Sequence, residues 1–101
     1  MISKEKCAKL GLPEPKSFHS QKGFILLCLL HGYKINTRIC RYIGIHNLHS
    51  ILSDLKSRGV PMLITHEQVW CPEQGLKPAR PVDVVMMSYS QRKEIMCRLG
   101  D

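Results

Sequence analysis

Four polar side chains lie close together in residues 47–53 and carry groups that suit the edges of DNA bases. Asn47 can form two hydrogen bonds with an adenine, and His49, Ser50 and Ser53 can each donate or accept one. The apolar residues among them recur with the i, i+3, i+4 and i+7 spacing of a helix, as Leu48, Ile51, Leu52 and Leu55. A helix that buries this apolar side turns the four polar side chains outward, so we expect them to contact bases.

Basic side chains before and after this segment could contact phosphate oxygens. Arg38 and Arg41 are three residues apart and therefore share one side of a helix. Ile39 is expected to face the core, which leaves both arginines outside. The residues expected to contact phosphate are Lys34, Arg38, Arg41, Lys56, Lys77 and Arg80. Asp54 argues against this surface, because a carboxylate repels phosphate, although such a group can also accept a hydrogen bond from a cytosine amino group or orient a nearby Arg.

Two short helices around a tight turn would position these side chains. Asn36 can cap a helix over residues 37–43, because its side-chain oxygen can accept an unpaired backbone N–H group. Gly44 suits the left-handed backbone that commonly ends a helix. The second helix is expected over residues 47–58. This is the pattern of a helix-turn-helix, whose second helix can enter a DNA groove.

The segments around this motif complete the expected fold. The apolar run at residues 24–30 predicts a central buried helix, and residues 61–70 and 81–87 predict two strands joined by a proline-rich loop. Residues 91–99 predict a last helix that packs on the core. The order of elements predicts an α+β fold, mainly α: a winged helix-turn-helix with a three-helix core, a two-stranded β-hairpin wing and an extra C-terminal helix.

The first residues set the expected domain organisation. Residues 1–15 are polar and contain Gly11, Pro13 and Pro15, which block a long helix. We therefore expect a flexible N-terminal arm over residues 1–15 and a single winged helix-turn-helix domain over residues 16–101.

One stretch of the chain carries a family resemblance. QKGFILLCLLHGYKINTRICRYIGIHNLHSILSDLKSRGV resembles the small winged helix-turn-helix proteins common in phages and prophages. In those proteins a short leucine-rich helix ends in Gly, a helix begins near Thr, and a Gly-Ile turn leads into a helix that ends before Gly. The match covers about residues 20–87, and it implies binding to double-stranded DNA.

The distribution of charge agrees with a nucleic-acid partner. The chain has a formal net charge of +7, and residues 16–58 hold seven Lys or Arg against one acid, Asp54. A basic surface attracts the phosphate backbone and releases its counterions. A high isoelectric point can also serve solubility alone. DNA is favoured because the excess charge coincides with the helix-turn-helix segment.

Several other classes of protein and site are disfavoured. The longest apolar run has seven residues, whereas a membrane span needs about 20. We expect a cytoplasmic protein that is associated with the bacterial nucleoid when bound to DNA, with five unpaired cysteines and no cofactor. No C-x-x-C occurs, and His46 and His49 lack a third ligand nearby, so no metal site is expected. Trp70 and Tyr89 are interpreted as packing residues.

The leading hypothesis is a non-enzymatic DNA-binding protein of phage or prophage type. It would serve as a transcriptional regulator or as a recombination or replication accessory, with the helix at residues 47–58 as recognition helix. A single small domain contacts few base pairs, so a homodimer is a candidate arrangement. The alternative is a winged-helix module that binds a host or phage protein and no DNA, since a fold does not determine function.

Overall fold

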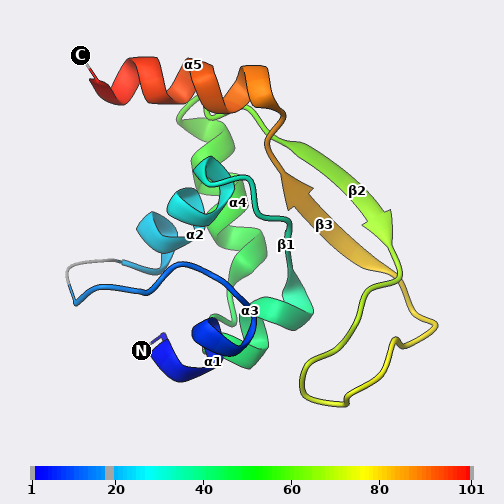
Figure 1. The fold of residues 1–101 in the computed structure, drawn as a ribbon. Coiled ribbons are helices and arrows are strands. Elements are labelled where there is room, and N and C mark those ends of the chain that lie inside the picture. Colours follow the sequence, from blue (N-terminus) through cyan, green and yellow to red (C-terminus); the bar gives the residue numbers. More distant parts are fainter. Residues whose placement is uncertain (1, 18–19, 101) are drawn as a thin grey trace.

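The computed structural model describes residues 2–17 and 20–100, with side chains as far as Arg98. Within these residues the chain forms five helices and three strands (Figure 1). In order they are α1 (Lys4–Lys9), α2 (Gln21–Leu30), β1 (Ile35–Asn36), α3 (Thr37–Ile43), α4 (Leu48–Ser57), β2 (Leu63–Glu67), β3 (Val82–Met86) and α5 (Tyr89–Gly100). The expected α+β class is confirmed.

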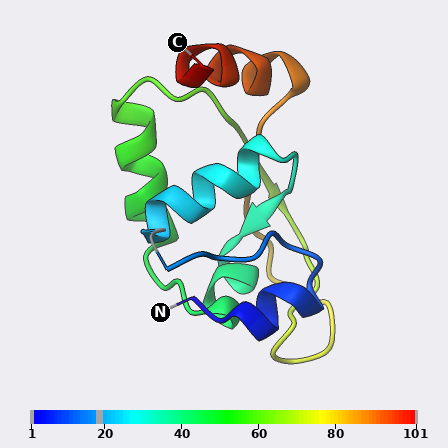
Figure 2. The same ribbon diagram turned by 60° about the vertical axis from the view of Figure 1, so that its left-hand side comes forward.

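Helix α2 forms the centre of the core. It begins after Ser20, whose hydroxyl accepts a hydrogen bond from the backbone N–H of Gly23 at 3.0 Å. Phe24, Ile25 and Leu29 are fully buried, as a run of apolar residues predicts. Figure 2 shows α2 crossing the middle of the molecule, with α4 beside it, α5 beyond one end and α1 on the opposite side.

The pair of helices α3 and α4 follows the sequence prediction closely. The side-chain oxygen of Asn36 accepts a hydrogen bond from the backbone N–H of Ile39 at 3.0 Å and so caps α3. Gly44 ends α3 with a φ of 106°, a left-handed conformation that costs glycine little. Helix α4 buries the predicted apolar side, made of Leu48, Ile51, Leu52 and Leu55. The opposite, polar side of α4 therefore faces away from the core.

The sheet has three strands, whereas the sequence predicted a two-stranded hairpin. All pairs are antiparallel in the order β1-β3-β2, and β1 joins through Ile35 opposite Val85 and Asn36 opposite Val84. A strand of two residues has no alternating pattern, which explains why the sequence did not reveal it. Strand β3 buries Val84 and Val85, while every residue of the edge strand β2 is exposed.

The N-terminal segment is packed onto the domain where a flexible arm was expected. Cys7 of α1 is fully buried, and Ile2 is 8% exposed. The backbone N–H of Ser3 donates to the carbonyl of Ile43 at 2.9 Å, which ties this segment to the end of α3. The apolar residues of this stretch do not recur with a helical or strand period, so periodicity did not predict such packing.

Helix α5 closes the end of the domain away from the α3–α4 turn (Figure 1). Ser88 and Gln91 cap its start reciprocally: the N–H of Gln91 donates to the Ser88 hydroxyl, and the N–H of Ser88 donates to the Gln91 side chain. Ile95 is buried in the core as the expected packing of this helix requires. None of the helices in the described ranges is long and apolar enough to cross a membrane.

Candidate nucleic-acid interface

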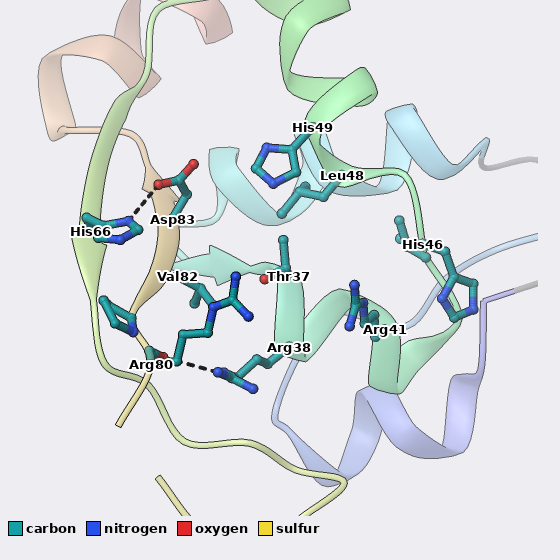
Figure 3. A pocket seen from close by; sticks show the side chains of 12 residues that line it. Thr37, Arg38, Arg41, His46, Leu48, His49, His66, Arg80, Val82 and Asp83 are labelled. Carbon is teal, nitrogen blue, oxygen red and sulfur yellow. Dashed lines mark hydrogen bonds and ion pairs between the residues drawn. The ribbon is translucent and has the colours of Figure 1, made fainter. Parts of the chain in front are cut away.

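A groove of about 440 Å³ runs between α3, the start of α4 and the β2–β3 hairpin. Thr37, Leu48 and Val82 form parts of its walls. Its charged and titratable side chains are three arginines, three histidines and one acid: Arg38, Arg41, Arg80, His46, His49, His66 and Asp83. The groove therefore has a cationic lining with one carboxylate (Figure 3).

Arg38 connects the two sides of this groove. From α3 its Nη2 donates to the backbone carbonyl of Arg80 at 3.1 Å, which holds the hairpin loop against the helix (Figure 3). The Nε atom of Arg38 is buried and has no hydrogen-bond partner among the described residues. Arg38 was expected outside, and the structure places it half-buried in the lining of the groove. Arg41, one turn further along α3, is exposed as predicted.

The single carboxylate of the groove is already partnered. His66 on β2 and Asp83 on β3 are directly opposite in the strand register, and His66 Nδ1 lies 2.9 Å from Asp83 Oδ1. Figure 3 shows this pair facing His49 across the groove. An anion bound in the groove would thus lie near the arginine side chains and near the Asp83 carboxylate, which is already hydrogen-bonded to His66. This pair was not predicted from the sequence, since only the strand register brings the two residues together.

The four residues expected to contact bases are all exposed on the start of α4. His49 lines the groove, whereas Asn47, Ser50 and Ser53 lie outside its lining and extend the surface along the helix. Asn47 stands at the N-cap of α4, and its side chain makes no capping hydrogen bond within the described chain. Its amide is therefore not committed to the helix start.

Asp54 does not oppose this surface in the way that its charge suggested. Its Oδ2 accepts hydrogen bonds from Lys22 Nζ at 2.7 Å and from Arg58 Nε at 3.0 Å. The hydrogen bond from Lys22 is the main reason why the pKa of Asp54 is lowered from its usual value, and Arg58 adds to the effect. Two cations thus compensate this carboxylate.

Of the six residues expected to contact phosphate, three lie together in the groove and three lie elsewhere on the surface. Arg38, Arg41 and Arg80 meet in the groove. Lys34, Lys56 and Lys77 are exposed at separate places, before β1, in the last turn of α4 and in the hairpin loop. The groove thus unites half of the predicted set.

Two aromatic residues differ from their interpretation as packing residues. Trp70 is 57% exposed and Tyr89 is 71% exposed. Arg92 and Lys93 lie over the Tyr89 ring, each 6.0 Å from its centre. The sequence around a single Trp next to a strand does not show whether its side chain will face the core or the solvent.

The cysteines show core packing rather than a site. Cys28 and Cys40 are fully buried, and burial raises the pKa of each thiol to about 12. Cys97 is exposed. Among residues 2–17 and 20–100, no three His, Cys, Asp or Glu side chains are grouped so that they could hold a metal ion.

Comparisons of this chain with protein-family models, with curated proteins and with solved structures found no match.

Proposed function

We propose that this chain is a non-enzymatic protein that binds double-stranded DNA through a winged helix-turn-helix domain. Helix α4 would enter the major groove as recognition helix, and the β2–β3 hairpin would be the wing. The observation that carries the proposal is the groove in which Arg38, Arg41 and Arg80 meet beside the exposed start of α4. Phosphate oxygens are the natural partners of such an arginine set.

The order of elements supports the same proposal. Helix α2, strand β1, helices α3 and α4 and then the hairpin follow one another as in winged helices, and β1 pairs with the hairpin strand β3. Helix α4 has ten residues and so is about 15 Å long. A helix can lie in the major groove, which is about 12 Å wide.

The proposed contacts divide into two kinds. Arg38, Arg41 and Arg80 would bind phosphates and thereby orient the domain on the duplex. The remaining proposed phosphate contacts, Lys34, Lys56 and Lys77, would extend this binding along the backbone. Base recognition is assigned to Asn47, His49, Ser50 and Ser53 at the start of α4.

The proposed biological setting is that of a phage or prophage protein acting in transcription regulation, recombination or replication. Such a protein would act in the cytoplasm of the host cell. Useful specificity would require a homodimer or adjacent copies, because a single domain of this size contacts few base pairs.

Selection from a pool of random DNA duplexes tests the proposal. The wild-type protein should enrich a motif of a few base pairs. The variant Asn47→Ala with Ser50→Ala should retain duplexes and lose part of that motif, since phosphate contacts remain. Lys93→Gln on α5 is a matched surface control and should enrich the wild-type motif. Failure to retain any duplex would refute DNA binding.

A second candidate function is binding of a host or phage protein. The observation that favours it is the edge strand β2, which exposes Leu63 at 46% and Ile64 at 38%. An unpaired strand edge can accept a strand from another chain. A protein of this kind would retain no duplex in the selection.

A further inference from the structure

The loop between β2 and β3, residues 68–81, has a fixed shape. At its base, Gln68 Nε2 donates to the carbonyl of Ala79 at 2.8 Å. Nearer its tip, the N–H of Cys71 donates to the carbonyl of Leu76 at 2.7 Å, and the N–H of Gly75 donates to the carbonyl of Cys71 at 2.9 Å. With the hydrogen bond from Arg38 to the Arg80 carbonyl, the loop is held at both ends.

This fixed loop exposes two large apolar side chains. Trp70 is 57% exposed and Leu76 is 50% exposed, whereas Cys71, which pairs with Leu76, is buried. Cys71 and Leu76 are antiparallel partners and share one face of this bridge, whereas Trp70, one residue before Cys71, lies on the opposite face. An exposed apolar side chain forgoes the free energy of burial, and a large aromatic one next to cations marks a candidate binding residue.

The charges around these side chains favour a nucleic acid as partner. The antiparallel register that pairs Cys71 with Leu76 puts Lys77 opposite Trp70. Arg80 follows in the same loop and lines the cationic groove. Both ribbon views show the loop beside α3, at the end of the molecule that carries the groove (Figures 1 and 2). A partner that combines an anionic backbone with flat apolar faces matches this arrangement.

We infer that Trp70 is an apolar wedge that contacts the faces of DNA bases when the duplex occupies the groove. The inference rests on the proposed DNA binding and adds a mode of contact to it. Lys77 and Arg80 would hold the backbone while the indole stacks on a base at a step that opens toward the minor groove. Pyrimidine–purine steps such as TA are preferred, because they unstack most easily.

Trp70 is the single tryptophan of the chain, so its fluorescence reports directly on this contact. A duplex with a central TA step is titrated while Trp emission and the anisotropy of a labelled copy are measured. Emission should be quenched and should saturate together with the anisotropy. Trp70→Ala should weaken binding about tenfold, as loss of one stacked base does, without changing the salt dependence. Trp70→Phe should keep most of the affinity, and Tyr89→Ala should match the wild type.

The outcomes separate this inference from the proposed function. If the anisotropy shows binding but Trp70→Ala binds as tightly as the wild type, the wedge is refuted and DNA binding stands. A change in the Trp70 emission of the wild type does not rescue the wedge if Trp70→Ala binds the duplex as tightly as the wild type. If the anisotropy shows no binding, both fail. Circular dichroism of Trp70→Ala and Trp70→Phe shows whether either variant has lost its fold.

Discussion

Arg38 links two of the three elements that line the groove. Its guanidinium reaches from α3 to the carbonyl of Arg80, 42 residues further along the chain. Lysine could supply the charge at this position but not the planar arrangement of N–H donors. Arg38 therefore positions the hairpin loop and also contributes charge, whereas Arg41 contributes charge from an exposed position.

Asp54 yields a prediction of pH dependence at the residue scale. Its lowered pKa means that the folded state favours the carboxylate more strongly than the unfolded chain does. Its stabilising effect is complete above the unfolded pKa of about 3.9 and is lost as the pH falls through the lower folded value. Asp54→Asn should therefore melt at a lower temperature than the wild type at pH 7, with a difference that shrinks in strong acid. Thermal denaturation between pH 2 and pH 7 measures this difference.

The matched control for Asp54 is Glu5→Gln. Glu5 lies 3.9 Å from Lys9 in an exposed pair one helical turn apart, which contributes little to stability. Its removal should leave the melting temperature nearly unchanged at all pH values. A deficit of Asp54→Asn that stays constant from pH 7 to pH 2 would contradict the assigned hydrogen bonds.

Single residues also mark the limit of prediction from the sequence. The apolar spacing in α4 correctly separated buried from exposed positions, because neighbouring turns of one helix fix that relation. Lys22 and Asp54 are 32 residues apart, and the contact between them depends on how α2 packs against α4. Local pattern carries no information on such a pair, so the compensation of Asp54 could not be predicted.

At the scale of elements, the turn between α3 and α4 determines where the candidate recognition surface lies. Gly44 reverses the chain with a positive φ, and Ile45 directly after it is fully buried. The N–H of Ile45 donates to the carbonyl of Cys40 at 2.7 Å, which completes the helix end. This turn fixes the angle at which α4 leaves α3 and hence the direction of His49 and Ser50.

Gly44→Ala should destabilise the domain. A residue with a Cβ atom pays about 1–2 kcal/mol in the left-handed conformation, so the free energy of unfolding should fall by about that amount. Urea denaturation followed by circular dichroism measures the change. Gly23→Ala in α2 is the comparison: Gly23 has helical backbone, so alanine carries no left-handed strain there, and its new Cβ would require only a small shift of the Ser20 hydroxyl, 3.1 Å away. Equal stability of Gly44→Ala and the wild type would contradict the strain argument.

Elements with a strong local signal were predictable, and those that depend on tertiary contacts were not. The expected caps at Asn36 and Gly44 correctly located helix boundaries, because capping is chemistry between near neighbours in the chain. Strand β1 exists only because β3 lies beside it. Helix α1 is likewise held by Cys7 in the core, and neither contact is visible in a local pattern.

At the scale of the whole molecule, the cationic groove arises where three separate elements converge. Arg41 lies on α3, His49 on α4 and Arg80 at the end of the hairpin loop. Each of these residues was expected from the sequence to contact DNA, since basic and polar side chains at exposed helix and loop positions are recognisable locally. Their convergence, and the His66–Asp83 pair beside them, depend on the antiparallel register of the hairpin.

The salt dependence of binding to a labelled DNA duplex, measured by fluorescence anisotropy, tests the central claim most directly. If Arg41 and Arg80 each neutralise a phosphate, the double variant Arg41→Gln with Arg80→Gln should reduce the slope of log affinity against log salt by about two units. Lys93→Gln, an equal loss of charge on α5, should keep the wild-type slope. DNA binding through this groove would be contradicted by an unchanged slope in the double variant, or by no wild-type binding even at low salt.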